Sequence, residues 1–294
     1  MPTPLIFAVV VLIWGTTWFA IKFQLGVVAP EVSLVYRFSL AAVCVFAYAR
    51  MTGSPLALSW RDHRFVALQG ASLFCLNYWL TYLSTQFLTS GLVAVLFTSI
   101  IFFNLVNSRL IFGNPVEPRV LAAAAAGVLG VALLFLPELR AALRNPAILH
   151  GAGLALGATY LASLGNMAAM RNTGGGLPVV TVNAYGMAYG AIGLALIAAL
   201  RGAPLAFDWH WPYVVSLLYL SLAGTSLAFG LYLALIRHIG ATRASYSSVL
   251  FPVVALMVST LFEGYRWSLP ALVGLGVLVA GNALALGGAR VARR

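Results

Sequence analysis

The sequence has 294 residues, of which 62% are hydrophobic and 8% are charged, and its formal net charge is +11. Ordinary soluble domains are about 45–50% apolar and about 25% charged, so this composition excludes a soluble globular protein. The basic residues are scattered between apolar stretches. This pattern argues against nucleic-acid binding and is typical of membrane-topology signals.

Ten apolar spans follow one another along the chain, each close to the ~20 residues that cross a bilayer core as a helix. Charged residues, prolines and glycines separate them, and Thr89, Ser90 and Gly91 supply the turn in the longest charge-free stretch. No Lys or Arg precedes Lys22, so the first span is expected to remain in the mature protein. The spans are predicted at residues 4–22, 32–49, 66–87, 91–111, 120–137, 150–170, 178–200, 212–236, 244–262 and 268–288.

The basic residues predict the orientation of these spans. With the N-terminus in the cytoplasm, cytoplasmic segments hold eleven Lys and Arg residues and the outer loops hold five. Because cytoplasmic loops carry the excess of positive charge, both termini are predicted to lie in the cytoplasm of an inner-membrane protein. The loops are short, so functional residues are expected between the helices.

Sequence fragments recur at a separation of about 150 residues. Tyr82-Leu83 recurs as Tyr232-Leu233, and Pro30 and Pro178 precede the second and seventh spans. Two copies of five spans enter the membrane from opposite sides, since five is an odd number. Inverted repeats of this kind are typical of transporters, which bind substrate at the repeat interface near the midplane.

Several motifs resemble the EamA repeats of the drug/metabolite transporter superfamily. They are the segment from Trp14 to Lys22, Tyr36-Arg37-Phe38, Phe262-Glu263, and the spacing of Gly274 and Gly281. The resemblance implies an all-α membrane protein of ten transmembrane helices, with repeats at residues 1–140 and 146–290 around a central cavity. The pattern most resembles YddG-type exporters, which release aromatic and other amino acids. Gly113-Asn114 stands where the family's first repeat usually has a Glu.

Charged residues within the spans are few. All six acidic residues lie in loops or at span ends, which argues against a proton antiporter for cationic drugs. Arg37 is the basic residue at depth, whereas a phosphorylated substrate would call for several. Arg37 either grips a substrate carboxylate, anchors a gate, or extends its charged end toward the membrane surface or nearby helix carbonyls.

Aromatic and neutral polar residues supply the remaining candidates. Tyr78 and Tyr82 are four residues apart on one helix face, and Tyr185 and Tyr189 repeat this spacing. Rings that enclose an apolar side chain, with hydroxyls and amides that meet an ammonium and a carboxylate, would suit a zwitterion. The candidate substrate-binding residues are Trp14, Thr17, Trp18, Arg37, Asn77, Tyr78, Tyr82, Asn183, Tyr185, Ser245 and Tyr246.

The sequence therefore predicts export of small neutral or zwitterionic metabolites, above all amino acids including aromatic ones, by alternating access. The alternatives are other drugs or metabolites, such as nucleosides or aromatic xenobiotics, and a non-transport membrane sensor or channel. An enzyme is not expected, since the spans hold no Ser–His or paired-Asp constellation and no metal-ligand cluster. No cofactor and no nucleic acid are expected; the partners are the substrate and the lipid bilayer, and the chain is a monomer or a homodimer.

Overall fold

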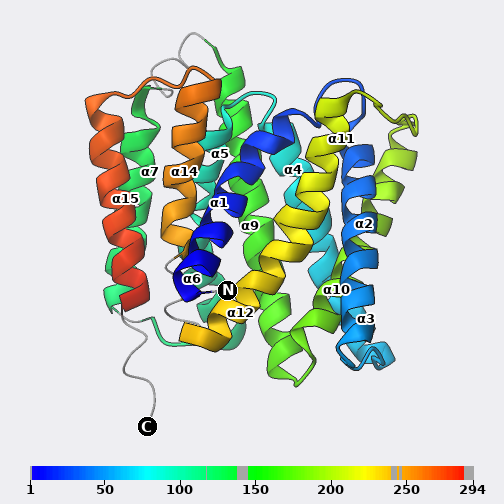
Figure 1. Cartoon of the computed structure of the whole chain (residues 1–294). Coiled ribbons are helices and arrows are strands. Elements are labelled where there is room, and N and C mark those ends of the chain that lie inside the picture. The colour runs from blue at the N-terminus through cyan, green and yellow to red at the C-terminus, as the bar shows by residue number, and fades with distance from the viewer. Residues whose placement is uncertain (1, 117, 138–144, 240–243, 245–246, 288–294) are drawn as a thin grey trace.

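The computed structural model describes residues 2–116, 118–137, 145–239, 244 and 247–287. Over these residues the protein is helical, with no strand, and the helices stand side by side (Figure 1). The start of α1 and the end of α15 point to the same side of the molecule (Figure 1).

The first part of the chain forms α1 (Thr3–Lys22), α2 (Pro30–Met51), a run of α3 (Trp60–Gln69), η1 (Gly70–Leu76) and α4 (Asn77–Ser84), then α5 (Ser90–Phe97), α6 (Ile100–Phe112) and α7 (Pro118–Leu134). The second part forms α9 (Ala147–Gly174), α10 (Val179–Leu200), a run of α11 (Trp211–Leu218), η2 (Tyr219–Leu227) and α12 (Ala228–Ile239), then α14 (Ser247–Phe262) and α15 (Leu269–Gly287). The elements η1 and η2 are π-helical, and each lies in the middle of its run.

Most of these helices have the length and apolarity of membrane spans. Six helices or helix runs in the described part of the chain are long and apolar enough to cross a bilayer, and three shorter helices are also apolar. Over the described residues, nine of the ten predicted spans each fall on one helix or run, and the fourth, residues 91–111, covers α5 and α6. The count of ten membrane crossings stays a prediction, because the run from Trp60 to Ser84 and the shorter helices do not meet the same measure.

Local sequence explains several helix ends. Pro30 begins α2, where its missing N–H and fixed φ cost nothing. The Ser59 hydroxyl accepts a hydrogen bond from the Asp62 backbone N–H and caps α3. Gly113 ends α6 at a φ of +69°, a conformation that glycine adopts without a steric penalty.

The packing pattern repeats between the two parts of the chain. Helix α1 packs against α14, η2 and α12, and in the same way α9 packs against α5, α6, η1 and α4. Helix α2 packs against α10, and α7 packs against α15. Helices at the same place in the two parts of the chain, such as α1 and α9, therefore have similar neighbours.

Glycines allow the closest helix contacts. A Cβ at Gly274 would lie 2.6 Å from the Leu134 backbone nitrogen and 2.7 Å from the Gly130 carbonyl oxygen. A Cβ at Gly190 would lie 2.6 Å from the Phe74 Cβ. Small residues thus allow the backbones of α7 and α15, and those of η1 and α10, to approach each other closely.

Candidate functional site

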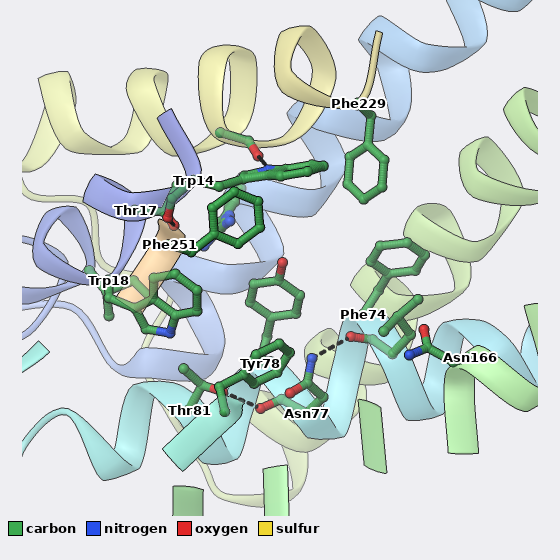
Figure 2. Close-up of a pocket in the computed structure, with 15 residues that line it drawn as sticks. Trp14, Thr17, Trp18, Phe74, Asn77, Tyr78, Thr81, Asn166, Phe229 and Phe251 are labelled. Atoms are coloured by element: carbon green, nitrogen blue, oxygen red, sulfur yellow. Dashed lines mark hydrogen bonds between the residues drawn. The ribbon is translucent and has the colours of Figure 1, made fainter. Parts of the chain in front are cut away.

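A cavity of about 270 Å³ lies in the centre of the helix assembly. Its walls come from both parts of the chain, since α1, α2, η1, α4 and α5 meet α9, η2, α12 and α14 there. Figure 2 shows Trp14, Phe229 and Phe251 facing Phe74, Tyr78 and Asn77 across it. The lining residues are Trp14, Thr17, Trp18, Ile21, Arg37, Leu73, Phe74, Asn77, Tyr78, Thr81, Phe97, Asn166, Gly224, Phe229 and Phe251.

Aromatic rings form one wall of the cavity. The Trp14 indole donates a hydrogen bond of 3.0 Å to the Gly224 carbonyl oxygen, which fixes the ring against η2. Phe229 and Phe251 meet Trp14 edge to face, with ring centroids 5.4 and 5.3 Å away. Trp18 packs on Phe97. This geometry, favourable for aromatic pairs, leaves a rigid apolar surface facing the cavity.

Arg37 supplies the cavity's charge, and it is the only charged residue among those that line the cavity in the described chain. The residue is 2% exposed. Its Nη1 lies 3.4 Å from the Tyr82 hydroxyl and its Nη2 lies 3.5 Å from the Thr225 hydroxyl, whereas its Nε has no hydrogen-bond partner in the part of the chain that the structure describes. Its guanidinium carbon lies 4.7 Å from the centre of the Tyr78 ring. None of the ion pairs between described residues includes it.

Asn77 supplies an unpaired acceptor on the same cavity. The residue is 4% exposed, and its Nδ2 donates to the Leu73 carbonyl oxygen one turn earlier, at 3.0 Å. Its Oδ1 is buried and has no hydrogen-bond partner among the residues that the structure describes. Because buried polar atoms are nearly always paired, a hydrogen-bond donor that reaches this oxygen would satisfy it.

A polar cluster joins the ends of α1, α5 and α14. The Glu263 carboxylate accepts hydrogen bonds from the backbone N–H and the hydroxyl of Ser90, at the first turn of α5. The Lys22 ammonium lies 3.6 Å from Glu263 and donates to the carbonyl oxygens of Thr85 and Leu88. A negative charge at a helix N-terminus is favourable, so the cluster ties the two parts of the chain together at this end.

The EamA-like transporter family model matches residues 1–136 and again residues 149–287. The chain belongs to this family. It is therefore a membrane transporter, and its central cavity lies between the two stretches that the family model matches.

Several relatives of this EamA-like transporter share most of its length. The Uncharacterized inner membrane transporter YedA of Escherichia coli K12 is 28% identical over 91% of this chain and 85% of its own. The Uncharacterized transporter YvbV of Bacillus subtilis is 24% identical over 94% and 89%. A solved crystal structure with 18% identity covers 98% of both chains with a TM-score of 0.68 and shares the fold.

The structure brings six of the sequence-predicted residues of this EamA-like transporter to the cavity, namely Trp14, Thr17, Trp18, Arg37, Asn77 and Tyr78. Tyr82 is fully buried and lies behind the lining, where its hydroxyl contacts Arg37. Ser245 and Tyr246 lie outside the described residues.

Two other predicted residues lie away from this cavity. Asn183 lines a second cavity of about 400 Å³ between α2, α10 and the η2–α12 run, which shares Phe229 with the first. The Tyr185 hydroxyl donates to the Leu56 carbonyl oxygen, and its ring packs on Phe46 and His63. Tyr185 therefore holds the segment before α3 rather than facing the central cavity.

Sequence reasoning missed several lining residues. Asn166 is an amide in the apolar middle part of α9, which is a signal that could have found it. Phe74, Phe97, Phe229 and Phe251 gave no such signal, because a phenylalanine in a membrane span is equally typical of a lipid-facing or a packed position.

Proposed function

We propose that this transporter exports small zwitterionic metabolites, above all amino acids including aromatic ones, through the central cavity by alternating access. One observation carries the proposal: a cavity between the two family-matched stretches, with aromatic walls and one buried cation. Transporters built from inverted repeats bind substrate at this interface.

The charge of the cavity favours amino acids over other solute classes. A phosphorylated solute would require several basic residues, and Arg37 alone lines the described cavity as a charged group. A cationic drug would be repelled by Arg37, since no carboxylate belongs to the described lining. An amino acid has a carboxylate that can pair with the Arg37 guanidinium and an apolar side chain that can pack on the aromatic rings.

Two inverted repeats, at residues 1–140 and 146–290, form part of the proposal. The repeated packing pattern and the two π-helical segments support it. The excess of basic residues in alternate loops supports cytoplasmic termini, and the relative YedA, named as an inner-membrane transporter, supports the same membrane.

Nucleosides and aromatic xenobiotics are the second candidate class. The rings of Trp14, Trp18 and Phe97 favour any flat apolar molecule. A neutral molecule of this class would leave the Arg37 guanidinium without a counter-charge, which places these solutes behind amino acids.

Counterflow in liposomes tests the proposal. The purified protein is reconstituted with unlabelled L-phenylalanine inside, and uptake of labelled L-phenylalanine is measured at equal pH on both sides. We expect uptake well above protein-free liposomes, blocked by neutral amino acids and unaffected by sugar phosphates. Exchange of uridine but not of phenylalanine would replace the amino-acid class by the nucleoside class.

A further inference from the structure

The Arg37 guanidinium is a buried cation that forms no ion pair with any described residue. Its two hydrogen-bond contacts are neutral hydroxyls at 3.4 and 3.5 Å, at the long limit for hydrogen bonds, and its Nε has no hydrogen-bond partner among the described residues. A buried charge is costly unless it is paired. A planar carboxylate is the ligand group that a guanidinium binds through two parallel hydrogen bonds.

The Asn77 amide requires a hydrogen-bond donor from the ligand, whereas Arg37 requires an acceptor. Its Nδ2 donates to the Leu73 carbonyl oxygen one turn earlier in the same run, and its buried Oδ1 has no hydrogen-bond partner among the described residues. An amide oxygen accepts but never donates, so it cannot hold a carboxylate. The group that it can hold is an N–H or O–H of the cargo.

Arg37, Asn77 and Tyr78 line the same cavity. The Tyr78 ring lies against the Arg37 guanidinium, and Tyr78 directly follows Asn77 at the start of α4. Trp14 and Phe251 stand on the opposite side of the cavity (Figure 2). The cavity lining therefore offers a cation and an amide as well as apolar rings.

We propose that Arg37 binds the carboxylate of the cargo and that the Asn77 Oδ1 accepts a hydrogen bond from the donor on the adjacent carbon. The selected class is a carboxylate with a neighbouring N–H or O–H and an apolar side chain. This inference rests on the proposed function and states which atoms of the amino acid are recognised.

A competition series in the counterflow assay tests it. Labelled L-phenylalanine is the probe, and the competitors are L-phenylalanine, phenethylamine, which lacks the carboxylate, and phenylpyruvate, which lacks the donor. In the wild type we expect the two analogues to compete at least about ten-fold more weakly than L-phenylalanine, because each leaves one buried group unpaired. Phenethylamine that competes as well as L-phenylalanine would overturn the role of Arg37. Phenylpyruvate that competes as well as L-phenylalanine would overturn the role of Asn77.

Two variants assign the selectivity to the side chains. Arg37→Met should abolish the preference for L-phenylalanine over phenethylamine, and Asn77→Leu should abolish the preference over phenylpyruvate. The matched controls are Arg109→Met and Asn114→Leu, whose side chains are near the exposed end of α6 and away from the cavity. Controls should keep both preferences.

The two proposals fail in different ways. Absence of any phenylalanine exchange by the wild type overturns the proposed function, and with it this inference. Exchange with undiminished competition by the analogues overturns this inference alone. If a variant loses all flux, its binding preference is measured instead as thermal stabilisation in detergent by L-phenylalanine, phenethylamine and phenylpyruvate. Equal stabilisation by L-phenylalanine and the relevant analogue supports the assignment. Stronger stabilisation by L-phenylalanine contradicts it.

Discussion

At the residue scale, the position of Arg37 depends on the two hydroxyls behind it. Tyr82 is fully buried and contributes one of them. We expect Tyr82→Phe to raise the KM for phenylalanine about five-fold, since a weak hydrogen bond to a charged group is worth about 1 kcal/mol. Initial uptake rates over a range of concentrations check this.

Tyr160→Phe is the control for that experiment, because Tyr160 is exposed on α9. It should leave KM unchanged. A Tyr82→Phe protein with the wild-type KM would show that the Tyr82 hydroxyl does not position Arg37.

Single residues also show where sequence reasoning reached its limit. The sequence alone predicts that Arg37 lies deep within its apolar span and that Trp14 and Trp18 lie one turn apart in the first span. Tyr185 has the same local pattern as Tyr78, yet its hydroxyl binds the Leu56 carbonyl oxygen, a contact between distant parts of the chain. Helical periodicity predicts on which face of a helix a residue lies, but it does not predict which other segment packs against that face.

At the element scale, α7 and α15 depend on glycine for their contact. A side chain at Gly274 would meet backbone atoms at 2.6 and 2.7 Å, and a backbone cannot rotate away. We expect Gly274→Leu to lower the melting temperature of the detergent-solubilised protein by several degrees, in line with the about 1–3 kcal/mol typical of overpacking. Light-scattering or fluorescence melting curves measure this.

Gly276→Leu on the same helix is the matched control. A Cβ at Gly276 meets nothing within 4 Å, and the substitution adds the same side chain to the same element. It should leave the melting temperature close to that of the wild type. Equal losses in both variants would indicate a general effect of removing glycine from α15.

The helices themselves follow closely from hydropathy, because apolar length fixes where a membrane helix begins and ends. The π-helical segments η1 and η2 did not follow from it. A π turn inserts one residue into the hydrogen-bond pattern without changing the apolar character of the span, so composition carries no sign of it.

At the scale of the whole molecule, the Lys22–Glu263–Ser90 cluster joins the two parts of the chain at one end of the cavity. We expect Glu263→Gln to weaken this junction and to favour the conformation open on that side, because the amide is neutral and has one acceptor oxygen instead of two. An Ile21→Cys probe in a background without Cys44 and Cys75 reports the opening, since Ile21 lines the cavity one residue before Lys22.

The measured quantity is the rate at which a membrane-impermeant maleimide labels that probe from the side where α1 ends. We expect Glu263→Gln to raise the rate about five-fold or more, the usual lower range of a coupling between states. Asp208→Asn, in the loop before α11, is the control and should not change the rate. An unchanged rate in Glu263→Gln would mean that the cluster does not hold the molecule closed.

Arg37, the one cation in the described lining of the cavity, also has an electrical consequence. Moving one elementary charge through a membrane potential of 100 mV involves about 2.3 kcal/mol. Arg37 belongs to the protein, and a zwitterion that binds to it brings no net charge of its own. If the cargo is a zwitterion that moves without a coupled ion, the voltage does no work on it, and its net flux runs from the side of higher concentration to the side of lower concentration.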